Sequence, residues 1–145
     1  LQNSKRNEIS INLDNMTINL NIPAGWRESK IDPTDKDNCI LKLIKSPSQE
    51  EVIEIIKISR NKNTLRDLTE MWAKKSGLEM IKIKWGIKKT DDYFWMLSRD
   101  KYRNISEVYS ISHNNHTFII RGKSTRDKYR YVKSALNSFF LSLNF

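Results

Sequence analysis

The sequence contains little of what would cross-link a small chain. Its 145 residues include one cysteine, Cys39, and two histidines. A single cysteine excludes an internal disulfide, so the fold must depend on the packing of its core. The four glycines are isolated, which excludes a glycine-rich loop for nucleotide phosphates. No apolar run approaches the roughly 20 residues that a membrane-spanning helix needs.

Length and composition predict one domain. Hydrophobic residues make up 38% of the chain, which is enough for a core in a chain of this size. Residues 1–8 are polar and predict an N-terminal tail, and 9–145 predict a single α+β domain. Because the chain starts at Leu1 and not at methionine, we expect either that a leader or tether was removed or that the chain was trimmed. A removed leader would place the protein in the cell envelope.

Acidic residues are scarce in the second part of the chain. Residues 1–50 carry seven basic and seven acidic side chains, whereas residues 51–145 carry 19 basic and 10 acidic ones. A basic half can steer the protein toward nucleic acid, lipid head groups or an acidic protein. The simpler interpretation is a lysine-rich surface that keeps the protein in solution, and the bias toward Ile, Lys and Asn is also typical of AT-rich genomes.

A hairpin is predicted at 9–22, where apolar and polar residues alternate on both sides of Asp14-Asn15. If these two residues form the turn, Leu13 faces Met16, and the apolar side chains that follow along both strands share one face. Pro23 and Gly25 end this hairpin.

A second hairpin is predicted at 105–121 around Asn114-Asn115 by the same argument. Residues 39–45, 52–59, 81–88 and 93–98 are further predicted strands. Residues 27–38 read as a loop. The predicted turns between the other strands are Ser46-Pro47-Ser48 and Thr90-Asp91-Asp92.

Two amphipathic helices complete the pattern. One begins after Thr64 as N-cap and ends before Gly77, and the other begins after Thr125 and runs to the C-terminal residues. Short links between successive strands favour antiparallel pairing. The predicted fold class is α+β, an antiparallel sheet of about six to eight strands flanked by two main helices.

Three short stretches resemble the PsbP/DcrB-like superfamily. They are an apolar strand running into Pro23-Ala24-Gly25-Trp26, a hairpin that leads through Asn114-Asn115 into Phe118–Gly122, and a closing helix with Ser134 to Phe140. The resemblance implies an α/β/α sandwich. It also implies a small non-enzymatic module, because members include photosystem extrinsic subunits, a Ran-binding nuclear protein, bacterial envelope lipoproteins and chaperones of type VI effectors. Leu1 is no lipobox cysteine, so a lipid anchor would have to precede it.

The predicted strand 81–88 carries lysine on one face. Lys82, Lys84 and Lys88, with Lys89 beside them, are the predicted surface for an anionic partner. The alternative is a strand edge protected by lysine. A nucleic-acid platform needs aromatic rings among the lysines, and Trp85 alternates to the other face, so nucleic acid is not expected as the partner.

Residues 93–97 are apolar on both strand faces. This pattern predicts either a central strand covered by helices on both sides, which the sandwich fold favours, or an apolar patch for a partner at Tyr93 and Trp95. By spacing, Trp72 and Trp85 are also assigned mostly to the core.

No catalytic or metal site is predicted. His113 and His116 face each other across a turn, but two imidazoles need further ligands to hold a metal. Asp91-Asp92 reads as a solvated turn rather than an acid–base pair. We therefore expect no cofactor and no enzyme activity, with a small enzyme or metal-binding protein as the least favoured alternative.

Two functions remain open at this point. The first is a protein-binding accessory module of a bacterial cell-envelope or secretion assembly, periplasmic or extracellular, that binds an acidic or membrane-associated protein. The second is a cytoplasmic adaptor chaperone, expected as a dimer, that holds a secreted effector on an open apolar sheet face.

Overall fold

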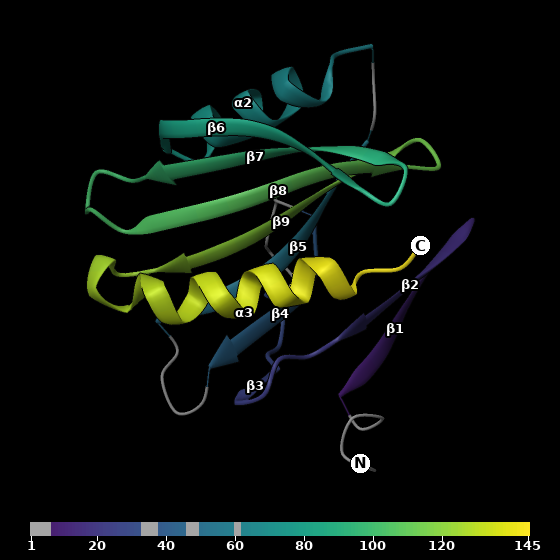
Figure 1. Ribbon diagram of the computed structural model, residues 1–145, viewed down its shortest axis with the longest axis horizontal. Coiled ribbons are helices and arrows are strands. Elements are labelled where there is room, and N and C mark those ends of the chain that lie inside the picture. Colours follow the sequence, from purple (N-terminus) through teal and green to yellow (C-terminus); the bar gives the residue numbers. More distant parts are fainter. Residues whose placement is uncertain (1–6, 33–37, 46–49, 60–61) are drawn as a thin grey trace.

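A computed structural model describes residues 7–32, 38–45, 50–59 and 62–145, and it contains two antiparallel sheets (Figure 1). Seven strands form the main sheet in the order β3-β4-β5-β9-β8-β7-β6, and β1 and β2 form a separate hairpin. The strands are β1 (Glu8–Leu13), β2 (Met16–Asn21), β3 (Trp26–Glu28), β4 (Cys39–Lys45), β5 (Val52–Ser59), β6 (Glu79–Lys88), β7 (Asp91–Arg99), β8 (Ile105–His113) and β9 (His116–Ser124). The predicted antiparallel α+β class is confirmed.

The two predicted hairpins have the registers that alternation requires. Leu13 pairs with Met16 across Asp14-Asn15, and His113 pairs with His116 across Asn114-Asn115. Asn114 and Asn115 have φ angles of 49° and 64°, a left-handed conformation that asparagine tolerates better than most residues. The short polar turns therefore set which side chains of each hairpin point inward.

The two helices cover opposite faces of the main sheet (Figure 1). Helix α2 (Leu65–Lys75) begins at Thr64, whose hydroxyl accepts a hydrogen bond from the amide of Asp67 at 3.1 Å. Gly77 follows the helix end with a φ of 74°. Helix α3 (Tyr129–Ser142) packs with the β1–β2 hairpin on the other face, and the larger core lies there. No helix within the described ranges is long and apolar enough to cross a membrane.

A predicted loop and a predicted turn need correction. Strand β3 (Trp26–Glu28) includes Arg27 and Glu28, the first residues of the predicted loop 27–38, because Trp26 is buried in the core against the sheet. The turn between β6 and β7 lies at Lys89-Thr90, and Asp91 already pairs with Lys88 as a strand residue. Lys89 provides the left-handed conformation of this turn, with a φ of 58°.

The final helix begins later than predicted. Thr125 precedes a 3-10 turn, Arg126–Lys128, and makes no capping hydrogen bond with its side chain. The α-helical hydrogen bonds start at Tyr129.

Glu8 pairs with Asn21 as the first residue of β1, so the predicted tail of residues 1–8 ends before Glu8. The predicted turn Ser46-Pro47-Ser48 lies outside the described residues.

The residues after α3 join distant parts of the chain. Asn144 exchanges two backbone hydrogen bonds of 2.8 Å with Asn19 of β2. Lys88 of β6 donates a hydrogen bond of 2.5 Å to the carbonyl oxygen of Leu143. The ring of Phe145 stacks on His113 with a centroid distance of 5.0 Å. Residues 143–145, called the C-terminal segment below, therefore connect the hairpin β1–β2 to one end of β6 and β8.

Candidate anion-binding cleft

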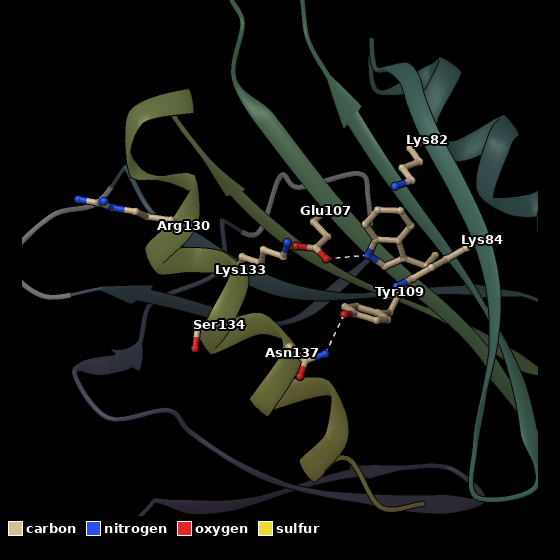
Figure 2. Close-up of a pocket in the computed structure, with 9 residues that line it drawn as sticks. Lys82, Lys84, Glu107, Tyr109, Arg130, Lys133, Ser134 and Asn137 are labelled. Carbon is tan, nitrogen blue, oxygen red and sulfur yellow. Dashed lines mark hydrogen bonds between the residues drawn. The ribbon is translucent and has the colours of Figure 1, made fainter.

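A cleft of about 500 Å³ opens between α3 and the strands β6, β7 and β8 (Figure 2). Volumes of several hundred Å³ are typical of ligand sites. The lining is basic and aromatic, and consists of Lys82, Lys84, Trp95, Glu107, Tyr109, Arg130, Lys133, Ser134 and Asn137.

Strand pairing places the lysines of β6 beside aromatic rings. Lys84 is opposite Trp95 of β7, and Trp95 is opposite Tyr109 of β8, so the three side chains share one face of the sheet. The ammonium of Lys84 lies 4.8 Å from the centroid of a Trp95 ring, within the range of a cation–π contact. The prediction that this lysine face lacks aromatic rings was therefore wrong, because the rings come from neighbouring strands.

Glu107 is the only acid among the described residues that line the cleft, and hydrogen bonds engage both of its carboxylate oxygens. It is 2% exposed and accepts hydrogen bonds of 2.6 Å from the indole Nε1 of Trp95 and the hydroxyl of Tyr129. Burial, followed by the hydrogen bond to Glu107, strongly raises the pKa of Tyr129, which keeps this donor protonated. The carboxylate thus fixes the Trp95 ring at the floor of the cleft.

Helix α3 supplies the opposite wall. Lys133 and Asn137 are four residues apart, so they project from the same helix face. The amide of Asn137 donates a hydrogen bond of 3.0 Å to the hydroxyl of Tyr109, and burial raises the pKa of that phenol. Lys133 extends from the helix toward Glu107, as Figure 2 shows. The wall therefore presents one ammonium and one amide to a ligand.

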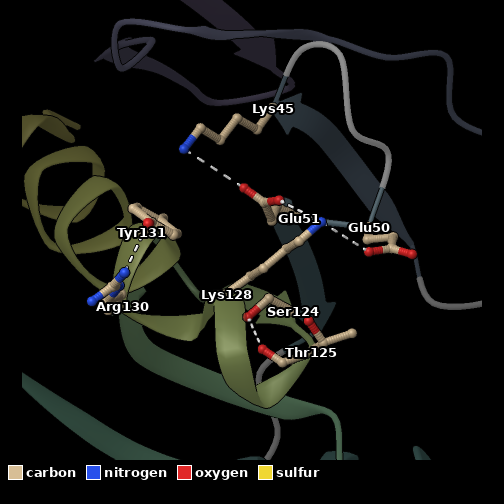
Figure 3. A network of polar contacts seen from close by, with 8 residues as sticks. All are labelled: Lys45, Glu50, Glu51, Ser124, Thr125, Lys128, Arg130 and Tyr131. Atoms are coloured by element: carbon tan, nitrogen blue, oxygen red, sulfur yellow. Dashed lines mark hydrogen bonds and ion pairs between the residues drawn. The ribbon is translucent and has the colours of Figure 1, made fainter.

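Basic residues elsewhere on the same face have acidic partners (Figure 3). Lys45 lies 3.7 Å from Glu51, and Lys128 lies 3.3 Å from Glu50, measured between the nitrogen and the carboxylate oxygen. In the cleft, by contrast, no such ion pair involves Lys82, Lys84 or Lys133 among the residues that the structure describes.

Arg130 contributes less positive charge to the cleft than its position in the lining indicates. Its guanidinium donates a hydrogen bond of 2.9 Å to the hydroxyl of Tyr131, and Figure 2 shows it pointing away from Glu107. The three lysines therefore carry the positive charge that a ligand in the cleft would meet.

The structure separates the four lysines that were predicted to form one surface. Lys82 and Lys84 line the cleft, whereas Lys88 is only 8% exposed and is bound to the C-terminal segment. Burial, followed by the charge of Lys89, lowers the pKa of Lys88. Lys89 donates a hydrogen bond of 3.0 Å to the side chain of Asn144. Lys88 must therefore be removed from the predicted contact surface.

The predicted apolar patch at Tyr93 and Trp95 is largely covered. Trp95 is 7% exposed, and the ring of Tyr93 packs edge-on against Phe140 of α3 at 5.1 Å. The strand is thus covered on both faces, as the sandwich interpretation required. Exposed apolar side chains on β6 include Trp85 and Ile87, on the face opposite the lysines, whereas Trp85 was predicted to lie in the core.

The two histidines do not converge with other metal-binding side chains. His113 stacks on Phe145, and the ring of His116 lies 6.1 Å from that of Phe118. Across the described ranges, no three side chains of His, Cys, Asp and Glu lie close enough together to hold a metal ion. Asp91 and Asp92 are strand residues opposite Lys88 and Ile87.

Comparisons with known proteins give a fold and no sequence family. No family model and no curated protein matches the chain. The cyanobacterial PsbP (CyanoP) of Synechocystis sp. PCC 6803 is similar in structure, with a TM-score of 0.69, 12% identity and coverage of 88% of this chain and 85% of that one.

Two further solved structures are similar over most of both chains. LpqN of Mycobacterium tuberculosis, described as involved in cell envelope biogenesis, has a TM-score of 0.65 and 8% identity, covering 94% of this chain and 89% of that one. A Pseudomonas aeruginosa protein of unknown function, described as a putative regulator, has a TM-score of 0.59 and 15% identity, covering 95% and 96%. Identities this low establish only the architecture, and the chain therefore has the PsbP-like fold.

Proposed function

We propose that the protein is a non-catalytic accessory module of a bacterial cell-envelope or secretion assembly, and that it binds an acidic segment of a partner protein in the cleft between α3 and β6–β8. The observation that carries the proposal is the set of three lysines, Lys82, Lys84 and Lys133, around a floor of aromatic rings. Their ammonium groups have no acidic partner within the described residues, so their charge is available to a ligand.

The concave shape of the cleft strengthens the electrostatic attraction between these lysines and an anionic ligand. A single exposed ion pair contributes little, typically about 0–1 kcal/mol. Several like charges in a concave site with low-dielectric walls act together, because the walls focus the field. Trp95 and Tyr109, both less than 10% exposed, form such a wall. A carboxylate entering the cleft meets the ammonium groups and the amide of Asn137, so it exchanges water for several charged or polar donors.

The chemistry of the lining supports binding rather than catalysis. Ser134 carries the only aliphatic hydroxyl among the described residues of the lining, and these residues include no histidine that could act as a base. The oxygens of Glu107 are held by Trp95 and Tyr129, which leaves this carboxylate poorly placed to transfer a proton to a ligand.

A location in the envelope is supported by the structural similarity to LpqN, which is described as acting in cell envelope biogenesis. The adaptor-chaperone alternative needs an open apolar sheet face. Helices α2 and α3 pack against the two faces of the main sheet, and the apolar side chains that β6 leaves exposed, which include Trp85 and Ile87, lie at the edge of the sheet. We therefore favour the accessory module.

Calorimetric titration of the full chain with an oligo-glutamate peptide at low ionic strength tests the cleft. Lys133→Glu in α3 should weaken binding about tenfold or more, since it reverses one of three converging charges. Lys74→Glu in α2 is the matched control, because it makes the same charge change on a helix of the opposite face. Equal losses in the two variants would mean that the peptide senses only net charge, which would refute the proposed site.

A further inference from the structure

The main sheet ends in two very different edge strands. At one edge, β3 has three residues, Trp26–Glu28. At the other, β6 has ten residues, Glu79–Lys88, and β7 is its only hydrogen-bonded neighbour within the described sheet. A short edge strand offers little to pair with, whereas a long one presents a row of amide and carbonyl groups that can pair with another chain. Figure 1 shows β6 at the outer side of the sheet.

One face of β6 bears exposed apolar side chains. Trp85 is 54% exposed and Ile87 is 69% exposed, and both lie on the α2 side of the sheet. Trp85 is held by an edge-on contact with the buried ring of Phe94 at 5.1 Å. Lysine on the other face and a register irregularity between Met80 and Lys82 are features of protected edge strands. The exposed tryptophan and isoleucine nevertheless leave an apolar strip open to a partner whose charge is opposite to that of the lysines.

The other face of β6 bears lysine around a close ring–backbone contact. Lys82 and Lys84 lie on this face, and Gly86 follows with the ring of Tyr93 directly over it. A Cβ atom at Gly86 would lie 2.3 Å from the Tyr93 ring, so only glycine allows the ring to reach the outermost strand. An added strand would thus meet two ammonium groups and a tyrosine ring on this side.

The charges argue against a second copy of this chain as the added strand. Residues directly opposite each other in antiparallel pairing point to the same side of the sheet. In a twofold pairing of β6 with itself, the lysine-bearing face of one copy would meet that of the other. Lys82 and Lys84 would then lie opposite or diagonal to lysines, which is destabilising. The edge suits a strand whose charge is of the opposite sign.

We propose that β6 binds an extended segment of a partner protein by strand addition, and that carboxylate residues alternate with apolar residues in this segment. Carboxylates at every second position meet Lys82 and Lys84, while the residues between them cover Trp85 and Ile87. Backbone hydrogen bonds between the segment and β6 hold the segment in place, so that its alternate side chains reach the two faces. This goes beyond the proposed cleft, because the pairing backbone and the apolar strip lie outside it.

Titration of the full chain with a synthetic peptide of about seven residues that alternates glutamate and valine tests the inference, since strands of this length are common. Fluorescence anisotropy of a labelled peptide gives the affinity. A second peptide, N-methylated at each central residue, keeps the charges and side chains but cannot pair. It should bind more than about tenfold more weakly, because several backbone hydrogen bonds are lost. Equal affinity of the two peptides would overturn strand addition.

Two protein variants test the apolar strip. Ile87→Ser should weaken binding of the alternating peptide severalfold, and Leu141→Ser should not. Leu141 is the matched control, because it is 61% exposed and lies on α3, which packs on the sheet face opposite to that of Ile87. Circular dichroism verifies that both variants are folded. Indistinguishable affinities of the two variants would place the peptide elsewhere and refute the inference.

The outcomes separate this inference from the proposed cleft. If Lys133→Glu abolishes oligo-glutamate binding while N-methylation has no effect, the cleft stands and strand addition fails. If N-methylation removes binding while Lys133→Glu changes nothing, strand addition stands and the cleft fails. Analytical ultracentrifugation of the wild-type chain tests whether a second copy of the chain pairs with β6 instead. A dimer that Ile87→Ser dissociates would show that a second copy occupies the edge and would overturn the proposal.

Discussion

The two ends of β6 carry the same kind of residue and use it differently. Near one end, Lys82 and Lys84 are exposed at the mouth of the cleft. At the other end, Lys88 and Lys89 both form hydrogen bonds to the C-terminal segment. The lysines at alternate positions of β6 therefore do not form one continuous surface. The C-terminal segment shields Lys88 from water, whereas none of the described residues covers Lys84. One end of β6 is therefore structural, and the other is open to a ligand.

The largest effect should come from breaking the packing beneath the covered end. Phe140 is 1% exposed, stacks on Tyr109 at 4.2 Å and packs against Tyr93. Phe140→Ala should lower the free energy of unfolding by about 3–5 kcal/mol, because it leaves a cavity among rings. Urea unfolding measures this loss. A loss below about 1 kcal/mol would mean that α3 does not anchor this end of the sheet.

The same substitution at Lys88 and at Lys84 tests directly whether the two ends of β6 differ in their contribution to stability. Lys88→Met removes the donor that satisfies the carbonyl of Leu143, and should cost about 1–3 kcal/mol of stability. Lys84→Met makes the same chemical change at the open end, and should change stability by less than about 0.5 kcal/mol. Equal costs for the two substitutions would contradict the division of β6 into a structural and an open end.

Removing the hydroxyl of Tyr129 tests the support of the cleft floor. Tyr129→Phe leaves one oxygen of buried Glu107 without its donor, which should cost about 1–2 kcal/mol at neutral pH. Because the folded-state pKa of Tyr129 is raised above the ordinary tyrosine value of about 10, the contribution of this phenol to stability is complete below pH 10 and falls as the pH rises beyond it. The stability gap between wild type and Tyr129→Phe should therefore narrow above pH 10. A gap that is constant with pH would show that this phenol titrates normally.

The smallest effect is expected at Lys89. Its hydrogen bond to Asn144 lies at the surface, so Lys89→Ala should change the free energy of unfolding by less than about 0.5 kcal/mol. Thermal unfolding beside Lys88→Met provides the comparison. A loss as large as that of Lys88→Met would mean that the surface contact, and not the buried one, fixes the C-terminal segment.

Much of the fold could be predicted because local patterns determine it. Alternation around Asp14-Asn15 and Asn114-Asn115 sets the registers of two hairpins, and Thr64 and Gly77 mark the ends of α2. The paired lysines and aromatic rings of the cleft were missed through one misplaced turn. With the turn at Lys89-Thr90, simple counting would have placed Lys84 opposite Trp95. The pair Asp91-Asp92 looked like a turn and hid this register.

Other features of the site depend on contacts that no local pattern shows. Lys88 is buried by Leu143, which is 55 residues away along the chain. The exposure of Trp85 depends on strand order, because a tryptophan in a central strand would be covered on both sides. Burial of a lysine and exposure of a tryptophan both reverse the usual preference, the first through a contact with Leu143 and the second through the position of β6 at the edge of the sheet.

The most direct test of the cleft follows the four indole N–H signals of the protein by NMR during titration with oligo-glutamate. We expect the Trp95 signal to shift at saturating peptide, because this ring forms the floor beneath Lys84. The signals of Trp26 and Trp72, which lie in the two cores, should stay in place. A titration in which Trp95 does not move while other signals shift would show that the anionic segment binds outside the cleft.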